Sequence, residues 1–90
     1  MGNIRWDITK NEWLKIERGV SFEEVMACIE NEQVLAIIEN PSHKYERQRV
    51  FVVSIKNYIY YVPFVEDNEG VFLKTIIPSR KLRKQYNEGE

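Results

Sequence analysis

Two strands joined by a tight turn are predicted by the stretch Arg49-Val50-Phe51-Val52-Val53-Ser54-Ile55-Lys56-Asn57-Tyr58-Ile59-Tyr60-Tyr61-Val62. Its first half is rich in Val and its second half in Tyr and β-branched residues, which are residue types that favour strands. Lys56-Asn57 has the length of a two-residue hairpin turn, although the preferred Asn-Gly pair is absent. Because strands joined by so short a turn pair antiparallel, this hairpin is the centre from which the rest of the sheet is predicted.

Pro63 limits how the second strand of the hairpin continues. Proline has no N–H to donate to a strand ladder, so the strand is bulged there, lies on an edge, or ends near Tyr61. An acidic turn over residues 66–70 follows, and residues 71–77 are predicted to form the last strand.

Two helix starts are readable in the first third of the chain. Thr9-Lys10-Asn11-Glu12 and Ser21-Phe22-Glu23-Glu24 each have the spacing of a capping box. Gly19, between them, suits the left-handed residue that ends a helix. The apolar residues after Ser21 recur at the spacing of one helical face. The sequence therefore predicts two consecutive short helices.

The predicted fold class is α+β. Residues 4–6 are predicted as a short first strand, and the apolar run 34–38 as a buried strand. The expected order is a short strand, two helices, an antiparallel sheet of about four strands, and a basic C-terminal helix from Ser79 to near Tyr86. We expect the two helices to cover one face of the sheet and the other face to stay partly open, flanked by the C-terminal helix.

Composition indicates one small domain over residues 1–90. The 90 residues are 43% hydrophobic, which is ordinary for a folded chain. Cys28 and His43 are the only residues of their types, which excludes an intramolecular disulfide and a Cys/His zinc site. Cys28 lies beside the helical stripe and is predicted to be a small core residue. No apolar run is long enough to span a bilayer. We therefore expect a cytoplasmic protein that needs no metal or other cofactor.

Charge is unevenly distributed along the chain, although its net value is only −1. Residues 1–46 hold five Lys/Arg against nine Asp/Glu, whereas residues 47–90 hold eight against five. The stretch 73–86 carries five cations and no acid. Such a chain can present a local basic face, as nucleic-acid binders do, or simply a solvated basic tail.

A group of cations is predicted near the end of the last strand. Strand alternation places Lys74 on the same face as Phe72 and Ile76. Arg80 and Lys81 follow, where a helix N-terminus would add its amides to a phosphate site.

Other cations and aromatic residues add to this group. Arg47 and Arg49 open an earlier strand and could converge on the same face. Stacking surfaces for single-stranded bases are offered by Tyr58, Tyr60, Tyr61 and Tyr86.

These residues suit metal-free chemistry on a phosphodiester. Ammonium and guanidinium groups hold a phosphate and neutralise the charge of its transition state, while the 2′-oxygen of RNA supplies the nucleophile. His43 is a candidate general base near neutral pH. The chain shows no Gly-rich phosphate loop and no other pairing of nucleophile and base. A plain binding module remains the alternative from the residues alone.

The order of several motifs resembles the BrnT branch of the RelE-like bacterial toxins. The matching segments are Ile4-Arg5-Trp6-Asp7, Lys10-Asn11, Gly19-Val20-Ser21-Phe22-Glu23-Glu24, the strand-opening Arg49, and Lys74, Ile77, Ser79, Arg80, Lys81 and Tyr86. The family's histidine before Gly-Val-Ser-Phe is Arg18 here, and Pro78 precedes Ser79-Arg80-Lys81. The resemblance covers nearly the whole chain.

The resemblance implies a RelE-like fold and a ribonuclease that arrests translation. It implies a cognate antitoxin of ribbon-helix-helix or helix-turn-helix type, through which alone the toxin contacts operator DNA. On this interpretation the catalytic candidates are Lys74, Arg80, Arg49 and Tyr86, and the RNA-binding candidates are Lys81, Arg47, Arg18 and His43. A toxin-like co-repressor without catalysis is the main alternative, favoured by Arg18 in place of histidine. A gyrase poison, like the ParE relatives, is a further one.

Overall fold

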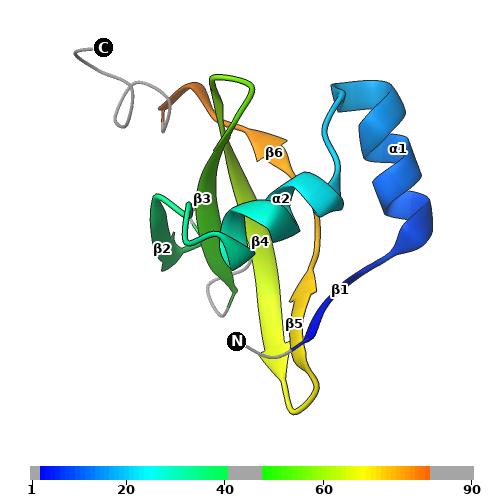
Figure 1. Ribbon diagram of the computed structural model, residues 1–90, viewed down its shortest axis with the longest axis vertical. Coiled ribbons are helices and arrows are strands. Elements are labelled where there is room, and N and C mark those ends of the chain that lie inside the picture. Colours follow the sequence, from blue (N-terminus) through cyan, green and yellow to red (C-terminus); the bar gives the residue numbers. More distant parts are fainter. Residues whose placement is uncertain (1–2, 41–47, 82–90) are drawn as a thin grey trace.

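The computed structural model describes residues 3–40 and 48–81, which form two helices and a sheet of six strands (Figure 1). In chain order the elements are β1 (Asn3–Trp6), α1 (Ile8–Arg18), α2 (Phe22–Glu30), β2 (Ala36–Glu39), β3 (Arg49–Ile55), β4 (Tyr58–Asp67), β5 (Gly70–Leu73) and β6 (Ile77–Pro78). The α+β class is confirmed. Of the predicted C-terminal helix, Arg80 and Lys81 are helical, and the part from residue 82 to Tyr86 lies outside the described residues.

The strands after the helices pair antiparallel, as predicted, but β1 joins them in parallel and the segment 71–77 gives two strands, so the sheet is mixed and has six strands. Its order is β1-β5-β4-β3-β2, and β6 also pairs with β4. β1 runs parallel to β5, whereas the other pairs are antiparallel. Two helices follow β1, so no tight turn forces it into a hairpin. Glycine at position 70 permits β1 to pack this closely against β5, because a Cβ there would lie only 2.2 Å from the carbonyl oxygen of Asn3.

The central hairpin forms as the sequence predicts. β3 and β4 pair from Arg49 opposite Phe64 to Ile55 opposite Tyr58. Lys56 and Asn57 have φ values of 53° and 65°, as a two-residue turn with both central residues left-handed requires. Positive φ at both positions matches the right-handed twist of the two strands and explains how the turn closes without glycine.

Pro63 lies opposite a bulge in the neighbouring segment, whereas its own strand β4 is neither bulged, nor at an edge, nor ended near Tyr61, the three possibilities that the sequence suggested. Phe64 of β4 pairs with Leu73, and Tyr61 pairs with Ile77. The two residues between Tyr61 and Phe64 on β4 therefore oppose the three residues 74–76, and one extra residue in a strand is a bulge. The predicted continuous strand over residues 71–77 is thus broken into β5 and β6.

The two helices begin and end at defined caps. Ser21 caps α2 in a capping box in which its side chain accepts from the amide of Glu24, as predicted. The predicted box at Thr9 is wrong, because Asp7 caps α1 and accepts from the amide of Lys10 at 3.1 Å. An aspartate one position before the first helical residue reaches that amide, and Thr9 already lies within the first turn.

Both helices contribute to a core on one face of the sheet, as predicted. Leu14 of α1 and Phe22 of α2 are fully buried in a cluster that includes Phe51, Phe64 and Ile76. α2 crosses this face in front of β3 and β4, and α1 lies farther out, beyond β1 and β6 (Figure 1). Cys28 packs against the same cluster, which confirms its predicted place.

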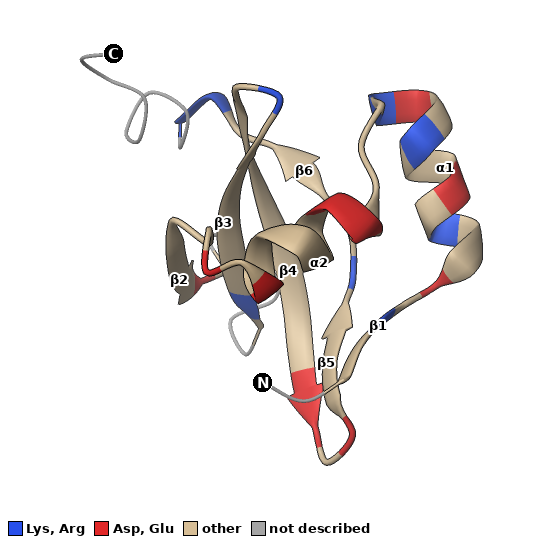
Figure 2. Cartoon of the chain, viewed as in Figure 1, with Lys and Arg blue, Asp and Glu red and all other residues tan. Residues whose placement is uncertain are grey.

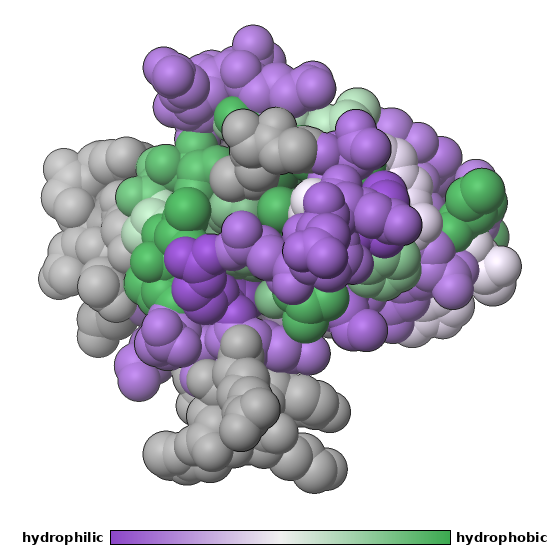
Figure 3. Space-filling view, turned by 90° about the horizontal axis from the view of Figure 1, so that it is seen from below, coloured by the Kyte–Doolittle hydropathy of each residue, from purple (hydrophilic) through white to green (hydrophobic). Residues whose placement is uncertain are grey.

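β2 is an edge strand and not the buried strand that its apolar sequence predicts. Ala36 and Ile38 pack against Val52 and Ile59 on the face opposite the helices. Ile37 points to the other side and is 47% exposed. Hydrophobic side chains show on the left of Figure 3, on the side where β2 lies in Figure 1. An apolar run gives no sign of whether its strand has one neighbour or two.

Candidate functional site

A pocket of about 410 Å³ lies on the face of the sheet opposite the helices and contains a predicted catalytic residue, Lys74. It is lined by Asn40, Gln48, Tyr61, Pro63, Lys74, Thr75 and Ile77. A larger hollow of about 610 Å³ between β1 and the end of α2 contains no predicted site residue. The pocket is therefore the candidate site.

The bulge decides which side chains meet in this pocket. In an unbroken strand Lys74 and Ile76 would share one face, and Ile77 would lie on the other. The extra residue instead sends Ile76 into the core beneath the helices, where it is fully buried. Lys74, Thr75 and Ile77 then all line the pocket. The predicted common face of Lys74 and Ile76 is therefore wrong.

Lys74 lines the pocket as an exposed residue whose backbone is fixed. Its N–H donates to the carbonyl of Pro63 at 2.8 Å. Its Nζ lies 5.4 Å from the centroid of the Phe72 ring. Among the described residues no acidic side chain forms an ion pair with Lys74. This ammonium can therefore take an anionic ligand.

The rest of the pocket combines an aromatic ring with side-chain amides. Tyr61 faces it from β4, beside Pro63. The side-chain amide of Asn40 donates to the side-chain oxygen of Gln48 at 3.3 Å, and the backbone N–H of Asn40 donates to the backbone carbonyl of Gln48 at 3.0 Å. A stacking ring beside amides and a lysine suits a planar, hydrogen-bonding anion such as a nucleotide. The amides and Thr75 were not predicted as site residues.

Three predicted site residues lie outside the described residues. His43 and Arg47 belong to the segment that joins Asn40 to Gln48, and both ends of that segment line the pocket. Tyr86 belongs to the chain beyond Lys81.

Arg18 lies on the helix side of the bulge and not in the pocket. It is the last residue of α1. Its guanidinium donates to the carbonyl oxygen of Ile76 and lies 5.0 Å from the centroid of the Trp13 ring. Arg18 therefore contacts the segment that carries Lys74 from the helix side, opposite the pocket.

Arg49 lies on the opposite face of the sheet from Lys74. It packs 5.3 Å from the centroid of Phe64, a core residue beneath the helices. It also forms an ion pair with Glu66. The structure thus does not bring Arg49 to the pocket.

Arg80 and Lys81 lie just past β6, and both are exposed. The N–H of Ser79 donates to the carbonyl of Ile59 at 3.1 Å, which continues the pairing of β6 with β4. In Figure 2 this basic segment and the basic tip of the β3–β4 hairpin lie at one end of the molecule, and the acidic β4–β5 turn lies at the other. The basic segment 80–81 therefore lies at the opposite end of the sheet from the acidic β4–β5 turn.

The tyrosines of β4 divide between the two faces. Tyr61 lines the pocket, whereas Tyr60 packs against the core beneath the helices. Tyr58 and Tyr60 are 5.5 Å apart between ring centroids. Burial raises the pKa of Tyr60 above its ordinary value, and the neighbouring Tyr58 raises it further. Tyr60 thus keeps its proton at neutral pH.

Fold and site together define a small α+β domain with a cationic pocket on its helix-free face. Within residues 3–40 and 48–81 there is no group of His, Cys, Asp or Glu that could hold a metal ion. No helix in the described part of the chain is long and apolar enough to cross a membrane. Comparisons with family models, with curated proteins and with solved structures give no match for this chain.

Proposed function

We propose that this protein is the toxin of a type II toxin–antitoxin pair and a metal-independent endoribonuclease with a RelE-like fold. The observation that carries the proposal is the pocket in which the bulge brings Lys74 beside Tyr61 and the amides. The resemblance to BrnT toxins is the reason for proposing RNA as the substrate. A cognate antitoxin of ribbon-helix-helix or helix-turn-helix type would neutralise the toxin and carry it to operator DNA.

Lys74 would hold the scissile phosphate while one base enters the pocket. An unpaired base can stack on Tyr61 and hydrogen-bond to side-chain amides, which requires single-stranded RNA. The 2′-oxygen attacks the adjacent phosphorus, the bond to the 5′-oxygen breaks, and a 2′,3′-cyclic phosphate and a 5′-hydroxyl result. The ammonium stabilises the extra negative charge of the transition state. This chemistry needs no metal ion.

Proton transfer would complete this step. A base must take the proton of the 2′-hydroxyl, and an acid must give one to the departing 5′-oxygen. Candidates for the base and the acid are His43 and Tyr86. Arg80 and Lys81, at the basic end, would bind phosphates that flank the scissile one.

One observation favours the alternative of a co-repressor without catalysis. Arg18, which replaces the family's histidine, is engaged with the carbonyl of Ile76. If that histidine moves protons in the family, Arg18 would not do so here. The protein would then bind through the same pocket without cutting.

Cleavage of a short single-stranded RNA by antitoxin-free protein tests the proposal. We expect products that end in a 2′,3′-cyclic phosphate, and Lys74→Ala should lower the rate about 100-fold or more. Lys10→Ala is the matched control, because it removes an equal charge from α1, away from the pocket. An RNA with 2′-deoxyribose at the cleavage point should remain intact.

Two results would oppose the proposal. Equal cleavage by wild type and Lys74→Ala would show that the site is elsewhere. Absence of cleavage, together with intact operator binding by the toxin–antitoxin complex, would favour the co-repressor.

A further inference from the structure

The bulge between β5 and β6 leaves a backbone carbonyl that the sheet does not use. In a regular ladder the carbonyls of alternate residues point to the neighbouring strand, whereas the extra residue of a bulge is unpaired. Within the described part of the chain no strand lies on the side of this segment away from β4, because the pairing of β1 ends at Leu73. Here three residues, 74–76, lie opposite only two of β4. A buried carbonyl without a partner is costly, so a bulge in a core needs a donor from elsewhere.

Arg18 supplies that donor from the end of α1. Its Nη1 donates to the carbonyl oxygen of Ile76, whose side chain is fully buried. The guanidinium also stacks near Trp13, one and a half turns earlier on the same helix. A hydrogen bond from a charged donor is stronger than one between neutral groups. The helix therefore fixes the bulge from the face opposite the pocket.

We infer that Arg18 is a positioning residue that holds Lys74 in its functional place by pinning the bulge. This inference rests on the proposed function for the role of Lys74, but the contact itself does not. On one side of the segment the N–H of Lys74 donates to Pro63, and on the other the carbonyl of Ile76 accepts from Arg18. The two bonds fix the backbone on both sides of Thr75, and so set the direction of the Lys74 side chain.

Arg18→Met is the sharpest variant, because methionine keeps an unbranched stem against Trp13 while it removes the donor together with its charge. Lys10→Ala is the control, since Lys10 also lies over the Trp13 ring, at 4.4 Å, and carries the same charge. Amide hydrogen exchange of Lys74 reports the bulge without any RNA. We expect exchange about tenfold faster or more in Arg18→Met, and an unchanged rate in the control.

A double-mutant cycle on RNA affinity separates positioning from direct contact. The probe is a short single-stranded 2′-O-methyl RNA, which cannot be cleaved, followed by fluorescence anisotropy. We expect Arg18→Met to weaken binding about tenfold in the wild-type background and to change nothing further in Lys74→Ala. Losses that multiply in the double variant would mean that Arg18 contacts RNA itself, and would overturn the inference.

The two readouts also keep the inference distinct from the proposed function. If wild-type protein fails to bind the RNA, the proposed function is refuted, while exchange at Lys74 still decides whether Arg18 pins the bulge. Unchanged exchange in Arg18→Met would overturn the positioning role, whatever the RNA result.

Discussion

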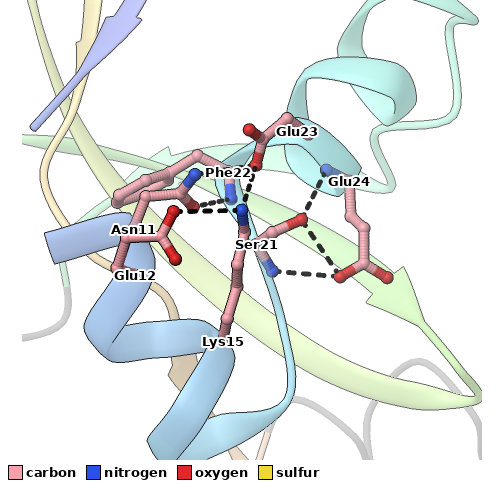
Figure 4. Close-up of polar contacts among 7 residues, drawn as sticks. All are labelled: Asn11, Glu12, Lys15, Ser21, Phe22, Glu23 and Glu24. Atoms are coloured by element: carbon pink, nitrogen blue, oxygen red, sulfur yellow. Dashed lines mark hydrogen bonds and ion pairs between the residues drawn. The ribbon is translucent and has the colours of Figure 1, made fainter. Parts of the chain in front are cut away.

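Replacement of Asn11 by alanine should destabilise the protein more than any other change on α1 that leaves the apolar core intact. Asn11 is only 3% exposed. Its Oδ1 accepts from the N–H of Phe22 at 2.7 Å, and its Nδ2 donates to Glu23 at 2.7 Å (Figure 4). One side chain thus joins the first turn of α1 to the first turn of α2.

The loss of folding free energy in Asn11→Ala is estimated from the two hydrogen bonds that the substitution removes. Without Asn11 the buried N–H of Phe22 has lost its acceptor, which costs about 1–3 kcal/mol. The bond to Glu23 is worth less, about 0.5–1 kcal/mol, because the Glu23 side chain is 52% exposed. The sum is about 1.5–4 kcal/mol. For a domain of this size the midpoint of thermal unfolding should fall by about 6–30 °C.

Thermal and urea unfolding of Asn11→Ala, beside Glu12→Ala on the same helix, measure this loss. Glu12 is an exposed residue whose ion pair with Lys15 spans 3.5 Å, so its removal should cost less than about 0.5 kcal/mol. A loss from Asn11→Ala no larger than that of the control would refute the reasoning.

The same bond makes part of the stability depend on pH. The hydrogen bond from Asn11 lowers the pKa of Glu23 below its ordinary value of 4.5. A carboxyl whose pKa is lower in the folded state stabilises the fold above its unfolded pKa. That contribution should therefore be complete above about pH 4.5 and disappear as the pH falls through the folded value. In Asn11→Ala the pKa of Glu23, followed by NMR, should return toward 4.5.

Two further changes probe the sheet and the core. Gly70→Ala should destabilise by more than about 1 kcal/mol in urea unfolding, because its φ is +129° and the added Cβ would strike the backbone of Asn3. Gly19→Ala is the control, with φ +67° but nothing within 4 Å; equal losses would contradict this account of how β1 docks. Burial raises the pKa of the Cys28 thiol above its ordinary 9.0, so iodoacetamide at pH 8 should alkylate it more slowly in folded protein than in urea. Equal rates in the two states would show that the thiol is not protected.

Local signals in the sequence predicted the parts of the fold that depend on neighbours along the chain. The hairpin turn at Lys56-Asn57 and the capping box at Ser21 involve only adjacent residues, and both form. The parallel pairing of β1 with β5 joins residues more than sixty positions apart, and nothing in the short strand itself specifies its partner. The edge position of β2 was missed for the same reason.

The lining of the candidate pocket was predicted in part. Lys74 was singled out as a lysine among the apolar residues of the predicted last strand, and it lines the pocket. The amide of Gln48 was missed, because an uncharged polar residue beside a loop carries no distinctive pattern. Arg49 was grouped with Lys74 by charge, but strand alternation puts the two on opposite faces. Which face a residue takes after the bulge depends on a register shift that a sequence does not display.

Pro63 and Arg18 both accommodate the register shift that the bulge introduces. In a strand the N and the carbonyl of one residue point to the same side. The carbonyl of Pro63 accepts from Lys74, so its ring nitrogen also faces the bulge, where three residues meet two and the pairing is already irregular. A proline there costs the sheet no donor that a regular ladder would need. The carbonyl of Ile76 has no partner in the described sheet, and it accepts a hydrogen bond from Arg18 on the helix side. A proline in β4 and an arginine at the end of α1, far apart in sequence, together fix the segment from which Lys74 reaches the pocket.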